Sequence, residues 1–124
     1  MNPRAFSTLG CPGAGLDEVV RLARSGPCSG VELRCSEGQL IHPESDPAEA
    51  DRIAGALRRA DLAVPVLASY VQVAADGPDV VEQLARRIAL AARLGAGQVR
   101  VFGGGAGLPR GRRERAVRLS LIHI

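Results

Sequence analysis

The chain has 124 residues, of which 46% are hydrophobic, so it is long enough for one domain with a buried core but contains no apolar stretch that would span a membrane. Its formal net charge of +3 comes from residues 110–124, where five arginines accompany a single glutamate. With only 2% aromatic residues there is no stacking platform beside these arginines, and we predict neither a nucleic-acid partner nor a membrane partner.

The chain begins with a strand and a helix that form one predicted βα unit. The strand covers residues 5–9 and ends at a turn containing Pro12, which a helix does not cross. The helix covers residues 16–25, because its apolar side chains recur on one face and Gly26-Pro27 stops it. A second strand is predicted over residues 30–35.

The second helix is predicted to begin at Pro47. Asp46 suits the cap position, proline suits the first helical position, and Glu49 is placed to reach back to the cap. The apolar positions that we expect to be buried are Ala50, Ile53, Ala54 and Leu57. A third strand over residues 62–68 follows, in which Pro65 cannot donate a ladder hydrogen bond.

The third helix is predicted from Asp79 to Gly95, because an acidic cap followed by Glu82 repeats the capping pattern of the second helix. Its expected buried positions are Val81, Leu84, Ile88, Ala91 and Ala92. A fourth strand covers residues 98–102. This succession predicts an α/β fold with a parallel sheet, which we interpret as the N-terminal half, about four βα units, of a TIM (β/α)8 barrel.

The end of the chain breaks the pattern. Only about ten residues separate a helix start near Arg110 from the apolar stretch 119–124, too few for a helix, a loop and a fifth strand. The last three positions also hold two isoleucines and a histidine, residue types that are scarce in the rest of the chain. We predict a partial barrel over residues 1–118 and a non-native tail over 119–124; the alternative is a natural strand that is cut short.

Five segments of the chain form an ordered set between residues 6 and 107. They are Phe6-Ser7-Thr8-Leu9-Gly10-Cys11-Pro12, Leu16-Asp17-Glu18-Val19-Val20, Gly30-Val31-Glu32-Leu33-Arg34, Leu90-Ala91-Ala92-Arg93-Leu94-Gly95-Ala96 and Val99-Arg100-Val101-Phe102-Gly103-Gly104. Together they resemble the sugar phosphate isomerase/epimerase family, whose members have a xylose isomerase-like TIM barrel.

The resemblance implies a complete barrel that binds one divalent metal at its C-terminal mouth, through Glu, Asp and His ligands mainly on strands five to eight. It implies an isomerase or epimerase that transfers protons next to the carbonyl of a small sugar or sugar phosphate, with the catalytic residues beyond residue 124. The fragment itself is then expected to bind no metal and to be inactive. What it retains are substrate contacts at the C-terminal ends of its strands.

Glu32 and Arg34 are the first candidates for substrate contacts, because residues two apart in a strand share a face. This face lies opposite Val31 and Leu33. Glu32 would orient a substrate hydroxyl, and Arg34 would meet an anionic group such as a phosphate. The alternative is a buried pair that neutralises itself inside the barrel.

His42 and Tyr70 are the other two substrate-binding candidates. His42 lies in the irregular stretch after the second strand, either at the mouth or as a surface loop residue, and it lacks the spacing of a metal ligand. Tyr70 is placed at the end of the third strand, where either its hydroxyl contacts the sugar or its ring packs at the rim.

The cysteines are predicted to be plain thiols. Three cysteines cannot all pair within one chain, and no signal-peptide pattern opens the sequence, which favours a cytoplasmic protein. Neither Cys11 nor Cys35 has a histidine within reach, so we expect no nucleophilic role for them.

Two other functions remain open. Gly13 and Gly15 after the first strand, with Glu32 about twenty residues later, are typical of a dinucleotide-binding βαβ domain, although Glu18 occupies the position of the third glycine. A half-barrel also leaves two sheet edges open, so two copies would close an eight-stranded barrel as a binding or assembly module. Such edges also predict self-association.

Overall fold

Strands and helices alternate throughout residues 2–74 and 79–104, which are the residues that this computed structural model describes. The elements in chain order are β1 (Ala5–Ser7), the 3-10 turn η1 (Thr8–Gly10), α1 (Leu16–Ser25), β2 (Gly30–Arg34), α2 (Pro47–Arg59), β3 (Val66–Gln72), α3 (Asp79–Leu94) and β4 (Gln98–Phe102). Within the described residues, no helix is long and apolar enough to cross a membrane. The predicted tail at 119–124 and the arginine-rich segment before it lie outside them.

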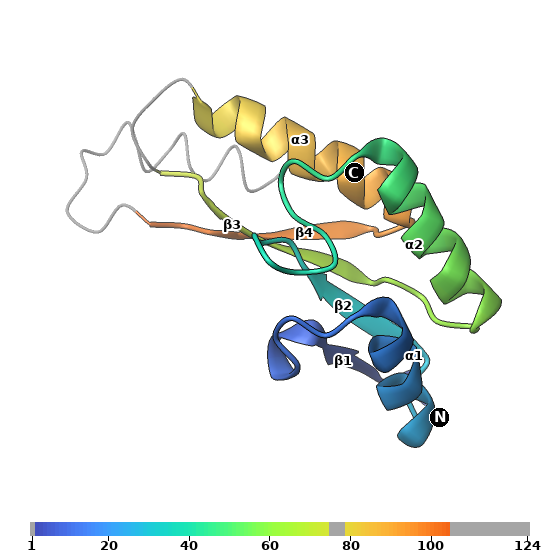
Figure 1. Cartoon of the computed structure of the whole chain (residues 1–124). Helices are drawn as coiled ribbons and strands as arrows, with labels where there is room; N and C mark the ends of the chain where they lie inside the picture. The colour runs from blue at the N-terminus through green and yellow to red at the C-terminus, as the bar shows by residue number, and fades with distance from the viewer. Residues whose placement is uncertain (1, 75–78, 105–124) are drawn as a thin grey trace.

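The strands form one parallel sheet in the order β1-β2-β3-β4. Because each crossover to the next parallel strand is right-handed, strands in sequence order place their helices on one face of the sheet. Figure 1 shows this arrangement, with α2 and α3 lying together over the same side. A dinucleotide-binding domain instead has its first strand in the interior of the sheet and helices on both faces, so that alternative is wrong.

The core lies between the helices and the sheet. Val31 and Leu33 are 0% and 1% exposed, and they pack with side chains from all three helices, including Val19 of α1, Ile53 of α2 and Ala91 of α3. Burial of this apolar layer is the main favourable term in the stability of the fold.

The first strand is shorter than predicted, because Ser7 turns the chain. Its side-chain oxygen accepts a hydrogen bond from the backbone N–H of Leu9 at 3.2 Å, and residues Thr8–Gly10 form η1 instead of continuing the ladder. A serine that bonds to its own backbone in this way competes with strand pairing. The second strand also ends one residue early, since Cys35 forms only an isolated bridge with Ile41.

The third strand lies four residues later than predicted. Leu62 and Val64 are buried as the apolar pattern suggests, but between them Ala63 forms only an isolated bridge with Gly30. The paired strand begins after Pro65, which has no N–H to donate to a ladder. Tyr70 is therefore an interior residue of β3 and not its end.

The second helix begins at Pro47, as predicted. The carboxylate of Asp46 accepts a hydrogen bond from the N–H of Ala48 at 2.8 Å, which satisfies one of the helix's free N-terminal donors. The predicted return contact from Glu49 to the cap is wrong. Glu49 instead binds Arg52 through two hydrogen bonds of 2.6 and 3.1 Å, because the guanidinium one turn along offers it a charged partner.

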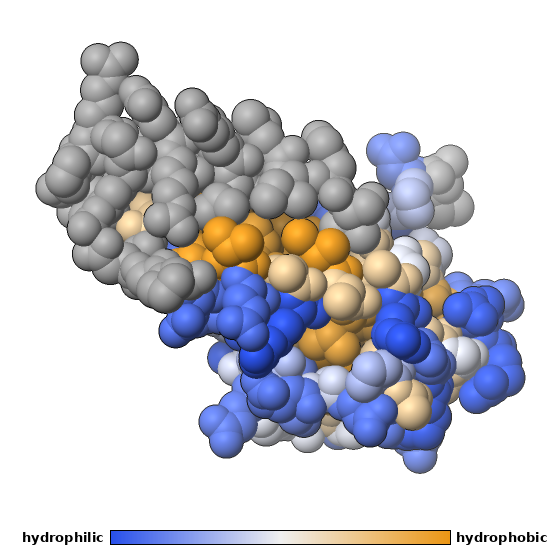
Figure 2. All heavy atoms as spheres, turned by 90° about the horizontal axis from the view of Figure 1, so that it is seen from above, coloured by the Kyte–Doolittle hydropathy of each residue, from blue (hydrophilic) through white to orange (hydrophobic). Residues whose placement is uncertain are grey.

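The third helix carries two adjacent apolar stripes, and the sequence alone did not show which one faces the sheet. The buried residues are Val80, Leu84, Leu90, Ala91 and Leu94. Val81, which was expected in the core, is 49% exposed, and Ala92 is exposed as well. Figure 2, which shows the molecule of Figure 1 from above, has apolar side chains gathered in the middle of this surface.

We predict that Asp46→Ala lowers the free energy of unfolding by about 1 kcal/mol, because the N–H of Ala48 loses its acceptor. Asp46→Asn keeps an acceptor oxygen, so its effect should stay within a few tenths of a kcal/mol. Urea unfolding followed by far-ultraviolet circular dichroism measures both variants. A D46A variant as stable as the unmodified chain would contradict the capping role.

Candidate functional site

Polar and aromatic side chains collect on the face of the sheet that the helices leave uncovered, called here the open face. Along β2 and β4 the residues on this face alternate with Val31, Leu33, Val99 and Val101, which pack toward the helices. The polar or aromatic residues of the open face include Ser7, Glu32, Arg34, Tyr70, Arg100 and Phe102. Glu32 and Arg34 thus share a face, as predicted.

The Glu32 carboxylate is held by the neighbouring strand. Ser7 lies directly opposite it in the parallel register, and the Ser7 hydroxyl donates a hydrogen bond of 2.7 Å to Oε1 of Glu32. No salt bridge between Glu32 and Arg34 forms among the described residues. The alternative prediction, in which Glu32 and Arg34 neutralise each other as an ion pair, is therefore wrong for this structure.

Arg34 and Arg100 approach the ring of Tyr70 from the strands on either side of β3. Their guanidinium carbons are 5.2 and 5.3 Å from the centre of the Tyr70 ring, and Arg100 also lies 4.9 Å from the ring of Phe102. The strands bring them there because Ala68 of β3 is the register partner of both arginines. Cation–π attraction favours such positions.

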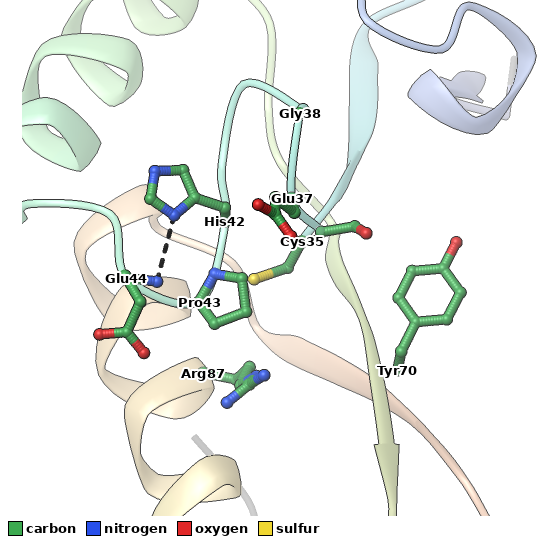
Figure 3. Close-up of a pocket in the computed structure, with 9 residues that line it drawn as sticks. Cys35, Glu37, Gly38, His42, Pro43, Glu44, Tyr70 and Arg87 are labelled. Carbon is green, nitrogen blue, oxygen red and sulfur yellow. Dashed lines mark hydrogen bonds between the residues drawn. The ribbon is translucent and has the colours of Figure 1, made fainter.

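A cavity of about 660 Å³ opens beside this cluster, at the end of β2 (Figure 3). Its walls come mainly from the loop between β2 and α2, with one residue from β3 and one from α3: Cys35, Ser36, Glu37, Gly38, His42, Pro43, Glu44, Tyr70 and Arg87. This volume suits a small-molecule ligand. Tyr70 belongs to both the cavity wall and the open face.

His42 lies in the loop after β2, as predicted, and its ring helps to shape that loop. Nδ1 of His42 accepts a hydrogen bond from the backbone N–H of Glu44 at 3.2 Å (Figure 3). The remaining proton of a neutral ring then sits on Nε2. Among residues 2–74 and 79–104, no group of three or more His, Cys, Asp or Glu side chains is arranged to hold a metal ion.

No protein-family model matches the chain, and no curated protein matches it. Among solved structures it is similar to the probable 3-DHS dehydratase AsbF of Bacillus anthracis, described as involved in petrobactin synthesis, with a TM-score of 0.70 and 17% sequence identity. The match covers 94% of this chain and 45% of that chain, which has a xylose isomerase-like TIM barrel. The fold is therefore the N-terminal half of such a barrel. This confirms the predicted fold class.

In the half-barrel, the open face is the wall of the barrel interior and the cavity lies at the C-terminal ends of the strands. Enzymes with this architecture carry their active sites at that end. Glu32, Arg34 and Tyr70 are thus on the interior wall, while His42 lies in a loop beside the mouth. The Arg34 guanidinium lies over the ring of Tyr70, whereas the Glu32 carboxylate is hydrogen-bonded to Ser7.

Two arginines of the half-barrel, Arg87 and Arg100, were not predicted as site residues from the sequence. Arg100 stands between Val99 and Val101, an alternation that already places it opposite the core, and this signal was available in the sequence. Arg87 lines the cavity from α3, but its place depends on how that helix packs against the β2–α2 loop, so no local pattern indicates it.

The cysteines of the half-barrel are free thiols, as predicted. Burial raises the pKa of the Cys35 thiol to about 11, and the nearby Arg87 charge offsets this only in part. Burial, together with the Glu18 carboxylate, also raises the pKa of Cys11. A raised pKa keeps both side chains in the neutral, weakly nucleophilic form.

We predict that Cys35 is alkylated by iodoacetamide much more slowly than Cys28 at pH 8, with its rate still rising toward pH 11. In the unfolded chain the thiol ionises near its ordinary value of 9.0, so its contribution to stability is complete below pH 9 and is lost as pH rises through 11. Mass spectrometry of the labelled peptides measures the site-specific rates. Equal labelling of Cys35 and Cys28 at pH 8 would contradict the burial of the thiol.

Proposed function

We propose that this half-barrel supplies the substrate-binding wall of an enzyme that acts on a small sugar or sugar phosphate by proton transfer next to a carbonyl. The observation that carries the proposal is the gathering of Glu32, Arg34 and Tyr70 on the interior wall of a xylose isomerase-like fold, beside a cavity at the strand ends. Such a cluster, on strands and not on a loop, gives a substrate a rigid surface.

Each of these residues has a defined role in the proposal. Ser7 fixes one carboxylate oxygen of Glu32, which leaves the other oxygen to accept a hydrogen bond from a substrate hydroxyl. The Tyr70 side chain is 40% exposed, so its hydroxyl is available to a second hydroxyl of the substrate. His42 would contact the substrate only from the loop beside the mouth.

The divalent metal that the fold family implies does not fit the described residues, because they contain no cluster of ligands for it. In the proposal, the metal site and the proton-transferring groups belong to the other half of the barrel, and this half alone binds substrate without turning it over.

Two outcomes of proton transfer are compatible with the fold. We favour isomerisation or epimerisation. Dehydration is the second candidate, because AsbF, which shares the fold, is described as a probable dehydratase. Isomerisation of a sugar and loss of water across the bond next to a carbonyl both begin with removal of a proton from the carbon beside that carbonyl. In isomerisation or epimerisation a solvent deuteron is then returned to carbon, whereas in dehydration the carbanion expels hydroxide, so an unsaturated product without deuterium entry would mark the second candidate.

The open edges of the half-barrel supply the other proposed partner. β1 and β4 are the outer strands of the described sheet, and each has only one neighbouring strand. Unpaired strand edges attract further strands. We propose that these edges bind either the missing half of a barrel or a second copy of the chain.

The proposed function is tested in a complete barrel that contains this chain as its first half. In ²H₂O, proton nuclear magnetic resonance should show deuterium entering the carbon beside the carbonyl of a substrate found in a panel of neutral aldoses and ketoses and their phosphates. Glu32→Gln should lower kcat/KM at least about tenfold, because the neutral amide is a weaker acceptor for the substrate hydroxyl.

The matched control is Glu18→Gln, which makes the same change on the exposed surface of α1. It should leave kcat/KM unchanged, and both variants should melt within a few degrees of the unmodified protein. Deuterium incorporation that is unaffected by E32Q, or reduced equally by both variants, would contradict the role of Glu32. The 124-residue chain alone should catalyse no exchange.

A further inference from the structure

The two arginines on the open face have no acidic partner among the described residues. The salt bridges among the described residues join side chains of the helices and of the β2–α2 loop. None of them includes Arg34 or Arg100. Glu32 is the sole acidic residue of the described strands, and it is hydrogen-bonded to Ser7. The interior wall therefore carries two positive charges against one negative charge.

The donor groups of these arginines are largely unused. The Nε–H groups of Arg34 and Arg100 are enclosed and have no acceptor within the described part of the chain. Arg100 donates one hydrogen bond, from a terminal nitrogen to the carbonyl oxygen of Ser69 at 3.3 Å, and none is formed by the Arg34 side chain. Each guanidinium has five N–H donors in a planar fork that matches the oxygens of a carboxylate or phosphate.

Both guanidinium groups also lie close to one aromatic ring, at 5.2 and 5.3 Å from its centre. The face of Tyr70 attracts each cation, but it is uncharged and cannot neutralise two like charges on a partly enclosed wall. An anion bound by both arginines would neutralise this charge and accept hydrogen bonds from their free terminal N–H groups.

We propose that Arg34 and Arg100 together form a binding site for an oxyanion, a phosphate or a carboxylate, carried by a small hydroxylated molecule. The identity of that molecule as a substrate rests on the proposed function. The site goes beyond a single arginine contact, because two forks from β2 and β4 converge over Tyr70 of the strand between them. Such convergence selects a substrate with an anionic group over a neutral sugar.

Three probes of the same carbon skeleton test the site on the 124-residue chain. Glycerol 3-phosphate carries a phosphate, glycerate a carboxylate and glycerol no charge. With ¹⁵N-labelled arginine, the Nε–H resonances of Arg34 and Arg100 should shift on titration with at least one of the two anions at fixed ionic strength, and glycerol should have no effect. The anion that binds more tightly identifies the group.

Arg34→Gln and Arg100→Gln should each weaken binding of that anion about tenfold or more, since each removes one charged fork. Arg21→Gln removes the same charge from the exposed surface of α1 and should change the affinity by less than about twofold. Equal weakening by all three variants, a response to glycerol like that to the anions, or no response to either anion would overturn the proposal.

A second measurement needs no variant and does not depend on how R34Q or R100Q folds. Phenylglyoxal modifies accessible guanidinium groups, and mass spectrometry locates the modified arginines. The preferred anion should slow modification of Arg34 and Arg100 severalfold while Arg21 reacts at the same rate; uniform rates with and without the anion would overturn the proposal.

The outcomes separate this site from the proposed function. Loss of the anion site alone would leave deuterium exchange into neutral sugars by a complete barrel intact. If the proposed function is wrong, a complete barrel will exchange deuterium into none of the carbonyl sugars, whereas the anion will still bind to this chain.

Discussion

The helices cover only one face of the parallel sheet, and this constraint determines where each strand side chain lies. Successive strand residues point to opposite faces, so a residue that packs against the helices fixes its neighbour on the barrel interior. Val31 and Leu33 are almost fully buried under the helices, which leaves Glu32 and Arg34 on the open face. The same alternation in β4 puts Arg100 beside Tyr70. One packing requirement therefore produces both the core and the candidate site.

The parallel register then decides which of these polar groups meet. Ser7 is opposite Glu32, and their side chains form a 2.7 Å hydrogen bond. Arg34 and Arg100 are both level with Ala68, whose small side chain leaves room for two guanidinium groups near the next residue on that face, Tyr70. A carboxylate held by a hydroxyl and two arginines without acidic partners form different chemical environments a few residues apart, one suited to a hydroxyl and the other to an anion.

Much of the architecture was predictable because its signals are local. The bounds of α1 and β4 match the prediction, and the cap at Asp46 forms as expected. The errors occur where a local pattern has two solutions. Leu62 and Val64 are buried but lie outside the paired strand, since Pro65 delays the ladder, and α3 offers two apolar stripes of which only one faces the sheet. Choosing between such solutions requires the neighbouring elements, which periodicity does not contain.

The sequence by itself determined the succession of strands and helices, the half-barrel fold class and the shared face of Glu32 and Arg34. These follow from residue periodicity and from capping, which act within a few residues. Only the tertiary structure decided that Glu32 bonds to Ser7 and that Arg34 and Arg100 flank Tyr70. It also brought Arg87 to the cavity. These contacts join residues separated by whole βα units, so they depend on strand register and helix packing, which are settled only when the sheet and its helices assemble.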